Sequence, residues 1–587
     1  MVSYGVMKNS VFTIKFGGEA GQGQGVSGAT FSKVAQRSGY HAFVYTELPS
    51  LIRGGHVTTQ VTVSEEEIHA AHKEVNVLVA LNREVIDWHL DELTDNAVIL
   101  FDSSRGDIKD MSFLKGKKVT LHQLPLSELV QQVGSKPITA NVVMTAAIFA
   151  LVGFKLEPLN DLIKETFTRK GEEIVQDNYQ AAKFGYAYGL KEFDVKNFPY
   201  KLKSGRPVKG KILVDGNQGI ALGAMAAGCK FYAGYPMTPS SSILHNLAGW
   251  AEKSGMIVKH AEDEIAVVHM AIGASFAGVR SMTSTSGGGF ALMSEAIALA
   301  GITETPLVAV LAQRAGPATG LPTWTEQGDL HFALHAGPGE FPRILLAPGD
   351  PKEAFELTIL AHHIAEVFQV PVILLSDKYV SENPKSVPEF DQSRVKIDHG
   401  KFLDAKTVAQ VKDYKRYELT KDGVSARVAP GTPGAVHLAN SDEHDEHGFS
   451  IEGWQPEIRK KMVDKRYAKV PAITKLMPKP KLYGVKSADV TLVGWGSTKG
   501  PVLEAMKEIP ANKVNFIHFT GLNPLDKASV EKILQGRKKI VTIENNHDGQ
   551  LAQLLGQEIQ FKPDNQLLTY SGRQFYPEEI IDAVKKL

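Results

Sequence analysis

The stretch YAGYPMTPSSS, Tyr232 to Ser242, is the most distinctive part of this 587-residue sequence. An apolar run leads into Gly234, and two prolines then enclose Thr238. Proline fixes its own φ angle and has no N–H to donate, so we expect a stiff turn between a strand and a helix. We expect this turn to present the Thr238 hydroxyl, with Ser240 or Ser241 capping the helix. An ordinary capped turn without chemistry is the alternative.

The next segment places acidic residues at the start of a predicted helix. Residues His260 to Gly278, HAEDEIAVVHMAIGASFAG, have Glu262, Asp263 and Glu264 before a run of small residues. The helix dipole favours acidic residues at a helix N-terminus, which is the purely structural explanation. The functional interpretation is that one carboxylate points into a pocket, where burial disfavours its charged form and prepares it for proton transfer.

Two further segments follow predicted strands of the same region. Residues Thr283 to Ile297, TSTSGGGFALMSEAI, place three glycines between a strand and a helix, where the backbone can approach a ligand closely. Arg314 follows a strand that ends near Leu311, and ligands of open α/β sheets bind at the carboxyl ends of strands. Because a guanidinium makes two parallel hydrogen bonds to a carboxylate, Arg314 is a candidate for binding an anionic substrate.

A second glycine-rich stretch, GGEAGQGQGVSG at Gly17 to Gly28, follows a predicted strand at Val11 to Phe16. Its second half matches the dinucleotide-binding pattern G-x-G-x-x-G, and Glu47 lies about 20 residues further on, where that fold places a ribose-binding carboxylate. A glycine-rich loop that enters a helix suits any phosphate or pyrophosphate, including that of coenzyme A. NAD binding and simple packing of helix on strand are the alternatives.

Alternating strand-like and helix-like segments predict a multidomain α/β protein. We place a first α/β domain at 1–200, a second at 211–382, an irregular connecting segment at 383–477 and a third α/β domain at 484–587. The residues between the first two domains form a basic linker. The irregular segment is long for a structureless loop, so we expect it to cover or complete a site.

The composition restricts the classes of function. Lys and Arg total 65 and Asp and Glu total 65, so no overall charge favours nucleic acid or an anionic membrane. We expect no signal peptide, a buried helix and not a membrane span at Ile138 to Phe154, and a cytoplasmic location. Cys229 is the only cysteine, which excludes an internal disulfide. An iron–sulfur cluster normally needs four thiolates, so any such cluster must belong to another subunit.

Taken together, these stretches resemble the alpha subunits of the 2-oxoacid:ferredoxin oxidoreductases, which use thiamine diphosphate. YPMTPSS closely matches the family signature, with Met237 where isoleucine is usual. The resemblance spans nearly the whole chain and implies a gamma-type domain, then a pyrimidine-binding domain of the thiamine diphosphate fold, then a transketolase-C-like domain. It is strongest to 2-oxoglutarate members with a fused gamma domain.

The resemblance also implies roles for individual residues. Glu264 matches the catalytic glutamate that hydrogen-bonds the aminopyrimidine ring and favours the imino tautomer, which deprotonates the thiazolium carbon. Thr238 and Arg314 match the residues that hold the carboxylate and oxo groups of the substrate. Further expected contacts with thiamine diphosphate are Tyr235, Pro236, Gly287 and Gly288, and candidate contacts with coenzyme A are Gly21, Gly23, Gly25 and, in the gamma-type motif IRGGH, Arg53.

One thiamine motif is missing. Thiamine enzymes anchor the diphosphate through magnesium with a Gly-Asp-Gly motif, and Asp215-Gly216-Asn217 precedes the pyrimidine motifs and lacks the right spacing. The resemblance implies that a beta subunit supplies the Mg²⁺ and diphosphate site and a [4Fe–4S] cluster, in an αβ or (αβ)₂ complex. We therefore expect half an active site, no metal site in this chain and no activity from the chain alone.

The leading hypothesis is oxidative decarboxylation of a 2-oxoacid with coenzyme A, giving acyl-CoA, carbon dioxide and reduced ferredoxin. Overall likeness favours 2-oxoglutarate, with succinyl-CoA as product, and pyruvate or a broad range of 2-oxoacids is the alternative. Two hypotheses of other classes are a non-catalytic nucleotide-binding or assembly subunit and a stand-alone NAD-dependent dehydrogenase.

We assign no catalytic or metal-binding role to two polar stretches. The acidic and histidine-rich cluster from His437 to His447 is expected to be a solvated or pocket-closing loop and not a metal site. The stretch IENNHDGQL, Ile543 to Leu551, follows a predicted strand and is expected to be a turn of the third domain.

Overall fold

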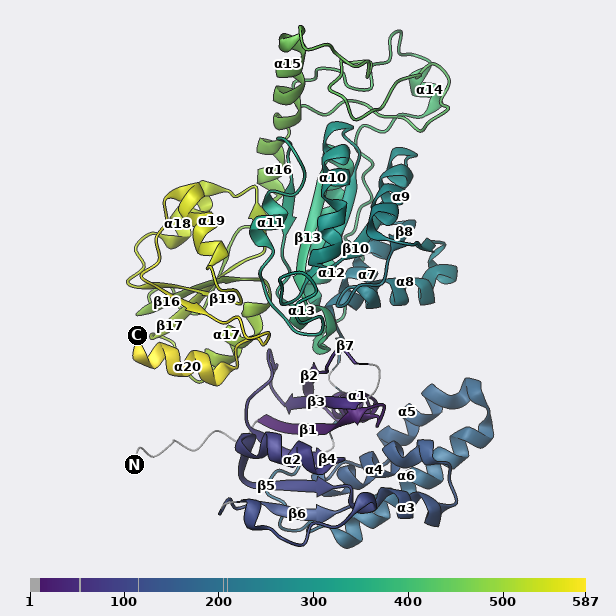
Figure 1. Ribbon diagram of the computed structural model, residues 1–587, viewed down its shortest axis with the longest axis vertical. Helices are drawn as coiled ribbons and strands as arrows, with labels where there is room; N and C mark the ends of the chain where they lie inside the picture. Colours follow the sequence, from purple (N-terminus) through teal and green to yellow (C-terminus); the bar gives the residue numbers. More distant parts are fainter. Residues whose placement is uncertain (1–10, 52–53, 115, 204, 208) are drawn as a thin grey trace. The chain divides into compact units, whose positions relative to one another are not determined.

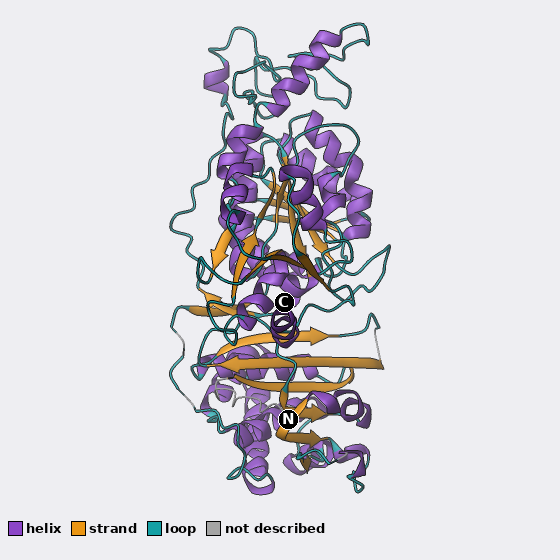
Figure 2. Ribbon diagram, turned by 90° about the vertical axis from the view of Figure 1, so that its left-hand side faces the viewer, coloured by secondary structure: helices purple, strands orange, loops and turns teal. Residues whose placement is uncertain are grey.

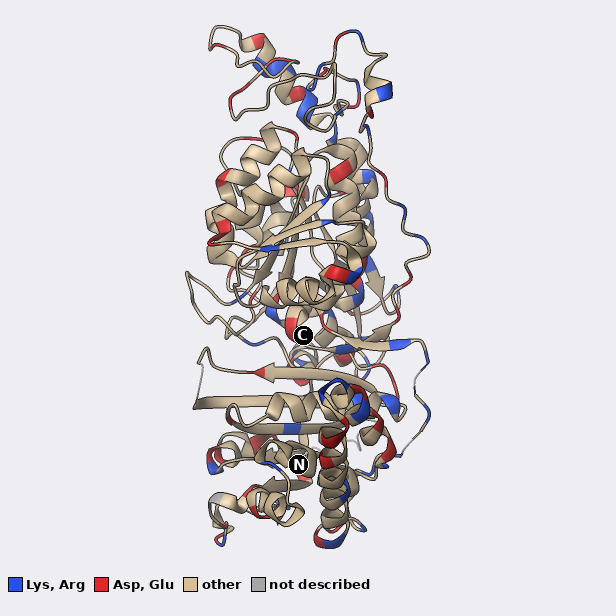
Figure 3. Ribbon diagram, turned by 90° about the vertical axis from the view of Figure 1, so that its right-hand side faces the viewer, with Lys and Arg blue, Asp and Glu red and all other residues tan. Residues whose placement is uncertain are grey.

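The computed structural model describes residues 11–51, 54–114, 116–203, 205–207 and 209–587 (Figure 1). The chain divides into two compact units, each built from helices and sheets, which confirms the predicted multidomain α/β fold. The first unit comprises residues of 1–214, 383–389 and 576–578, and the second comprises 215–382, 390–575 and 579–587. In both units, residues of positive and negative charge are interspersed along the helices and loops (Figure 3).

The first unit is built on an eight-stranded mixed sheet, whose long strands are visible in Figure 2. In order across the sheet, its strands are β6 (Thr120–Gln123), β5 (Leu93–Phe101), β4 (Val75–Ala80), β1 (Val11–Ala20), β3 (Gly54–Ser64), β2 (His41–Glu47), β14 (Lys385–Pro388) and β7 (Lys211–Val214). β6, β5, β4 and β1 run parallel, and the remaining neighbours pair antiparallel. Sequence reasoning assigned β7 to the second region and β14 to the connecting segment, but their ladder hydrogen bonds lie in this sheet.

Strand residues of the first unit alternate between two cores, because successive side chains of a strand point to opposite faces. Val77 and Val79 belong to the core that includes α1 and α4, whereas Leu78 and Ala80 belong to the core that includes α2. The helices of this part of the chain are α1 (Gln24–Arg37), α2 (Arg83–His89), α3 (Leu126–Val133), α4 (Ala140–Val152), α5 (Glu157–Phe167) and α6 (Glu172–Glu192).

The apolar helix α4 is buried, as its sequence predicts: every residue from Val143 to Val152 is buried. Among the described residues, no single helix is long and apolar enough to cross a membrane. The bent pair Leu126–Val133 and Pro137–Val152 is long and apolar enough only when its two helices are counted together.

The second unit contains two sheets. The larger sheet has the order β18 (Gly521–Asn523), β12 (Ile344–Leu346), β13 (Pro371–Asp377), β11 (Leu307–Gln313), β10 (Ser281–Thr285), β8 (Phe231–Gly234) and β9 (Ile257–His260). All its neighbours are parallel except β18. The smaller sheet has the order β15 (Lys481–Tyr483), β17 (Val514–Phe519), β16 (Val490–Trp495), β19 (Ile540–Glu544) and β20 (Asn565–Leu568).

Helices cover both faces of the larger sheet. Leu307 and Leu311 of β11 belong to the core formed with α9 and α10, and Val308 and Val310 belong to the core formed with α7, α8 and α12. The first of these cores also includes Trp495 of the smaller sheet, so the two sheets of the unit share one apolar core. The helices are α7 (Gly216–Ala226), α8 (Ser241–Ser254), α9 (Glu264–Phe276), α10 (Gly287–Ile302), α11 (Leu330–Leu334), α12 (Pro351–Phe368), α13 (Lys378–Glu382), α14 (Ala405–Val408), α15 (Pro456–Tyr467), α16 (Val470–Leu476), α17 (Lys499–Ala505), α18 (Lys527–Leu534), α19 (Gln550–Ile559) and α20 (Pro577–Lys586).

Candidate functional site

The candidate site lies where three neighbouring parallel strands, β8, β10 and β11, end at the same edge of the larger sheet. The segments that follow these strands carry Thr238, the three glycines at 287–289, and Arg314. Two helices complete the frame, α9 and α10, which lie side by side (Figure 1). Carboxyl ends of parallel strands are the usual binding edge of open α/β sheets.

The turn after β8 is stabilised by hydrogen bonds from a buried side-chain amide. Asn217 is fully buried, and its Nδ2 donates to the Pro239 carbonyl and to the Ser242 hydroxyl oxygen, each at 2.7 Å. Ser240 Oγ donates to the Met237 carbonyl at 2.8 Å, so no side chain caps α8 and the predicted serine cap is wrong. The turn is therefore stabilised by its own backbone carbonyls and by Asn217.

Only one of the three predicted acidic residues is buried. Glu262 is exposed, and Asp263 caps α9 by accepting a hydrogen bond from the Ala266 N–H at 2.7 Å. Glu264 is the first residue of α9 and is 3% exposed. Its Oε1 atom is buried and has no hydrogen-bond partner in the described part of the chain. A buried carboxylate oxygen without a partner is costly unless a ligand supplies a donor.

The three glycines after β10 have different surroundings. A Cβ atom on Gly289 would lie 2.5 Å from Glu264 Oε1 and 2.0 Å from Thr285 Oγ1, so only glycine lets α10 approach Glu264 this closely. A Cβ atom on Gly287 would lie 2.9 Å from Asp329 Oδ2, whereas a Cβ atom on Gly288 would meet nothing within 4 Å. Gly288 is therefore exposed and borders open space, one residue before the glycine that approaches Glu264.

Thr238 and Arg314, predicted from separate motifs, lie together in the structure. Arg314 directly follows β11, and its Nη1 donates to the Thr238 carbonyl at 2.9 Å. The Arg314 Nε is buried and has no partner among the described residues. The Thr238 side chain is half-buried. One end of the guanidinium is thus fixed by the β8 turn, and the buried Nε–H has no partner among the described residues.

Tyr235 and Pro236, two further predicted contacts, lie on the surface of the same turn. Pro236 is exposed, and Tyr235 is 37% exposed with its ring centroid 6.4 Å from that of His260.

Two carboxyl groups near Arg314 were missed by sequence reasoning, although they stand in the stretch QRAGPATGLPTWTEQGDL that contains Arg314. Burial raises the pKa of Asp329 to about 6, and the Arg314 charge opposes this shift. Burial and the Asp329 charge raise the pKa of Glu326 to about 7. The Asp329 backbone N–H donates to Gln313 Oε1 at 2.9 Å, which ties this loop to the end of β11.

The loop that carries both carboxyl groups is clamped by the turn after β19, which belongs to the stretch IENNHDGQL. Gln327 is fully buried; its N–H donates to the Asn545 carbonyl at 2.6 Å, and its Oε1 accepts from the Asn545 N–H at 2.9 Å. Asn546 Nδ2 donates to the Gln327 carbonyl at 3.2 Å, and Gln550 Nε2 donates to the Gly328 carbonyl at 2.8 Å. This polar stretch thus orders a loop of the candidate site.

The glycine-rich stretch of the first unit is partly strand. β1 extends to Ala20, and Gly21 and Gly23 then adopt positive φ angles of 93° and 89°. Gly25 lies in the first turn of α1, where a Cβ atom would meet nothing within 4 Å. Ile52 and Arg53 of the IRGGH motif lie outside the described residues. The other three candidate coenzyme A contacts therefore border the entrance to α1.

Glu47, the carboxylate that a dinucleotide-binding fold would need, is the last residue of β2. It is 7% exposed, and its Oε1 accepts a hydrogen bond from the Tyr45 hydroxyl at 3.0 Å.

The cluster from His437 to His447 has separate partners for its histidines. His444 is fully buried, with Nε2 3.2 Å from the Ile302 carbonyl oxygen, and His447 Nε2 lies 3.0 Å from Asp413 Oδ1. In the described part of the chain, no group of three or more His, Cys, Asp or Glu side chains is placed to hold a metal ion.

Comparison with known proteins gives two family matches. Residues 222–464 match the family described as pyruvate flavodoxin/ferredoxin oxidoreductase, thiamine diphosphate-binding. Residues 13–188 match the family described as pyruvate ferredoxin/flavodoxin oxidoreductase.

Similar proteins cover nearly the whole chain. The 2-oxoacid:ferredoxin oxidoreductase subunit alpha of Saccharolobus solfataricus is 31% identical, over 97% of this chain and 96% of its own. The 2-oxoglutarate oxidoreductase subunit KorA of Mycobacterium tuberculosis is 31% identical, over 92% of this chain and 86% of its own. The structure of 2-oxoglutarate:ferredoxin oxidoreductase from Magnetococcus marinus, with 2-oxoglutarate, coenzyme A and succinyl-CoA bound, has a TM-score of 0.89 and 32% identity and covers 98% of this chain and 99% of its own.

Proposed function

Because this chain belongs to the alpha subunits of the 2-oxoacid:ferredoxin oxidoreductases, we propose that it oxidises 2-oxoglutarate with coenzyme A to succinyl-CoA and carbon dioxide, in an active site shared with a beta subunit. The proposal for 2-oxoglutarate is supported by the KorA relative and by the similar structure that holds 2-oxoglutarate and succinyl-CoA. Pyruvate or a broad range of 2-oxoacids is the second candidate, since the Saccharolobus relative carries the broader name.

The residues at the edge of the larger sheet fit the pyrimidine half of thiamine diphosphate, and the unpartnered, buried Oε1 of Glu264 is the observation that carries this assignment. Oε1 of Glu264 would accept a hydrogen bond from a ring nitrogen of the cofactor, and the open space at Gly288 would leave room for a flat ring. Tyr235, Pro236 and Gly287 would make further contacts with the cofactor in this proposal. The bound cofactor supplies a carbon nucleophile that stabilises the charge left by decarboxylation.

Arg314 and Thr238 bind the substrate carboxylate in this proposal. The hydrogen bond from Arg314 Nη1 to the Thr238 carbonyl fixes the guanidinium plane, and the buried Nε–H is then directed at the anion. A charge-assisted hydrogen bond in a site shielded from water is stronger than a neutral one. In this proposal, Glu264 binds the cofactor and Arg314 orients the substrate.

The remaining components belong to partners. With one cysteine and no Gly-Asp-Gly motif, this chain leaves the Mg²⁺, the diphosphate site and the [4Fe–4S] cluster to a beta subunit. Ferredoxin accepts the electrons, and the complex is cytoplasmic, as αβ or (αβ)₂. In the first unit, Gly21, Gly23 and Gly25 at the entrance to α1 contact coenzyme A, as does Arg53 of the IRGGH motif.

An anaerobic assay of the chain co-expressed with its beta subunit tests this function. We expect reduction of a viologen dye that depends on coenzyme A, that is faster with 2-oxoglutarate than with pyruvate, and that is absent with the chain alone. Faster turnover of pyruvate than of 2-oxoglutarate would assign pyruvate as the preferred substrate. No reduction with any 2-oxoacid, despite bound thiamine diphosphate and an intact cluster, would reject the function.

A further inference from the structure

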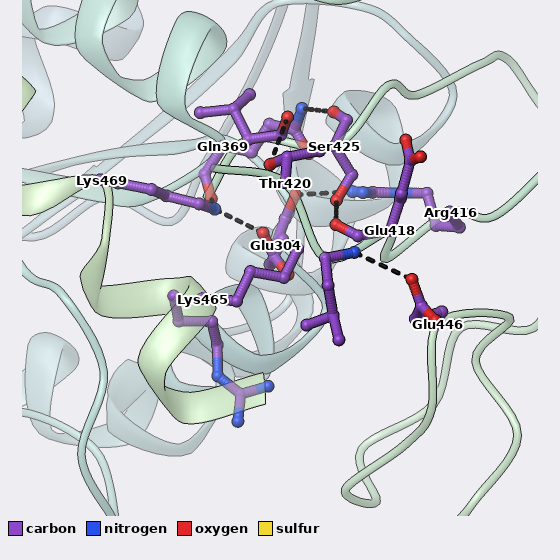
Figure 4. A network of polar contacts seen from close by, with 12 residues as sticks. Glu304, Gln369, Arg416, Glu418, Thr420, Ser425, Glu446, Lys465 and Lys469 are labelled. Atoms are coloured by element: carbon purple, nitrogen blue, oxygen red, sulfur yellow. Dashed lines mark hydrogen bonds and ion pairs between the residues drawn. The ribbon is translucent and has the colours of Figure 1, made fainter. Parts of the chain in front are cut away.

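The segment at 390–477, which follows β14, is fixed to the rest of the second unit by buried charges (Figure 4). Lys465 of α15 and Lys469, just before α16, each place Nζ 2.5 Å from a different oxygen of Glu304. Arg416 Nη2 donates to the carbonyls of Thr303 and Glu304 at 3.2 and 2.8 Å. Figure 4 shows these cationic side chains converging on Glu304.

A second buried acidic residue, Glu366 of α12, lies among further cations. Arg427 pairs with Glu366 through Nη2 and donates from Nη1 to the Ser275 carbonyl of α9 at 3.0 Å. Arg280 Nε lies 3.9 Å from the other Glu366 oxygen. His399, which is largely exposed, approaches Glu366 at 3.3 Å.

These buried charges do not balance. Apart from Arg466, which pairs with the less buried Glu443, the charged residues of this region that are at most 5% exposed are two acids, Glu304 and Glu366, and the bases Arg280, Arg416, Arg427, Lys465 and Lys469. Three positive charges are therefore left in excess, and a buried ion without a counter-ion is unfavourable. Burial lowers the pKa of Lys465 to about 7 and also lowers the pKa of Lys469, in both cases against the opposing charge of Glu304.

The uncompensated charge borders a small cavity. A cavity of about 10 Å³ is lined by Phe276, Thr305, Pro306, Arg416, Arg427 and Val428. Arg416 Nη1 and Arg427 Nε are buried and have no hydrogen-bond partner among the described residues. Two guanidinium groups that repel each other thus line one space, each with a spare N–H.

We propose that this cavity binds a monatomic halide anion, chloride in the cell, between Arg416 Nη1 and Arg427 Nε. A water molecule would accept these N–H groups but would leave the positive charge uncompensated, whereas a halide does both. A space of this size has room for a single small particle, so phosphate and organic acids are excluded.

The anion has a structural role. Arg416, Arg427 and Val428 belong to the segment after β14, and Phe276 is the last residue of α9, the helix that begins at Glu264. Chloride therefore joins this segment to the far end of the helix that presents the buried carboxylate. A ligand that binds only the folded protein raises its stability by mass action.

Thermal unfolding of the assembled complex tests the proposal. At constant ionic strength, replacing potassium gluconate by potassium chloride is expected to raise the midpoint of unfolding until it saturates within physiological chloride concentrations. The Arg416→Gln complex is expected to lose this chloride dependence. Arg394→Gln is the matched control, because Arg394 lies in the same segment with a side chain 92% exposed.

Bromide supplies an independent measurement that needs no variant. Crystals of the complex soaked in bromide are expected to show an anomalous peak between Arg416 and Arg427. Absence of a peak in the cavity would overturn the proposal. A peak without any chloride-dependent change in the unfolding midpoint would also overturn it, since binding would then occur at crystal concentration only. Neither readout depends on enzymatic activity, so failure here is distinct from failure of the proposed function.

Discussion

Glu264 differs from its acidic neighbours in the environment of its carboxylate. Glu262 is exposed and Asp263 caps a helix, but Glu264 is buried with one oxygen that has no partner. An acidic cluster before a helix rich in small residues could be predicted from the sequence. Which oxygen stays unpaired could not be predicted, because that depends on the close approach of Gly289 in the neighbouring helix α10.

Replacement of Gly289 tests this close approach. In Gly289→Ala the new Cβ would lie 2.0 Å from Thr285 Oγ1 and 2.5 Å from Glu264 Oε1, so the neighbours must move. We expect a loss of about 1–3 kcal/mol in the free energy of unfolding and weaker binding of thiamine diphosphate, measured by denaturant titration and calorimetry. Gly288→Ala, which meets nothing within 4 Å, is the stability control. Equal stability of the two variants would contradict the packing.

The raised pKa of Asp329 predicts that the stability of the folded chain depends on pH. Burial raises its pKa to about 6 in the folded chain, above the ordinary value of 3.8, so the folded state binds the proton more tightly than the unfolded state. Stability from this group is therefore present at low pH and is lost as pH rises from about 4 to about 6. We expect Asp329→Asn to unfold at a higher temperature than the wild type at pH 7.5, with the difference shrinking toward pH 4. A difference that is constant over this range would refute the shifted pKa.

At the scale of elements, the decisive feature is the clamp between the loop after β11 and the turn after β19. Strand ends, glycine turns and the position of Arg314 could be predicted because each depends on a short local pattern. The clamp could not, since Gln327 and Asn545 lie far apart in sequence and meet only when the two sheets of the second unit share a core. The same limit explains β7 and β14, short strands whose assignment depends on a partner distant in the chain.

Removal of the Gln327 side chain tests the clamp. Gln327→Ala leaves the Asn545 N–H without its partner and removes one donor to the Trp495 carbonyl, which the Thr498 hydroxyl still contacts. An unsatisfied buried polar group costs about 1–3 kcal/mol. Because the loop carries Asp329 beside Arg314, we also expect a higher KM for the 2-oxoacid, with a smaller change in kcat. Gln557→Ala, at an exposed position of α19, is the control. An unchanged KM in steady-state kinetics would show that this loop has no influence on substrate binding.

At the scale of the whole molecule, the chain combines a gamma-like region with a region of thiamine-binding type, as the two family matches indicate. Alternating strands and helices made this architecture predictable, and the missing Gly-Asp-Gly motif and single cysteine predicted an incomplete active site. The sequence predicts an irregular segment at 383–477, whereas the structure has β14, α14, α15 and α16 within it. The attachment of this segment through Glu304 could not be predicted, because both lysines are distant in sequence from their partner.

The most direct test of the account is the activity of Glu264→Gln in the assembled complex, with thiamine diphosphate, cluster content and subunit stoichiometry measured on the same sample. Glutamine keeps the size of the side chain but cannot share a proton with a ring nitrogen. We predict an intact complex whose kcat for 2-oxoacid-dependent dye reduction falls by about 10²–10⁴-fold, the usual contribution of a positioned acid–base group. A fully active complex would contradict the account and would leave this chain as an assembly subunit.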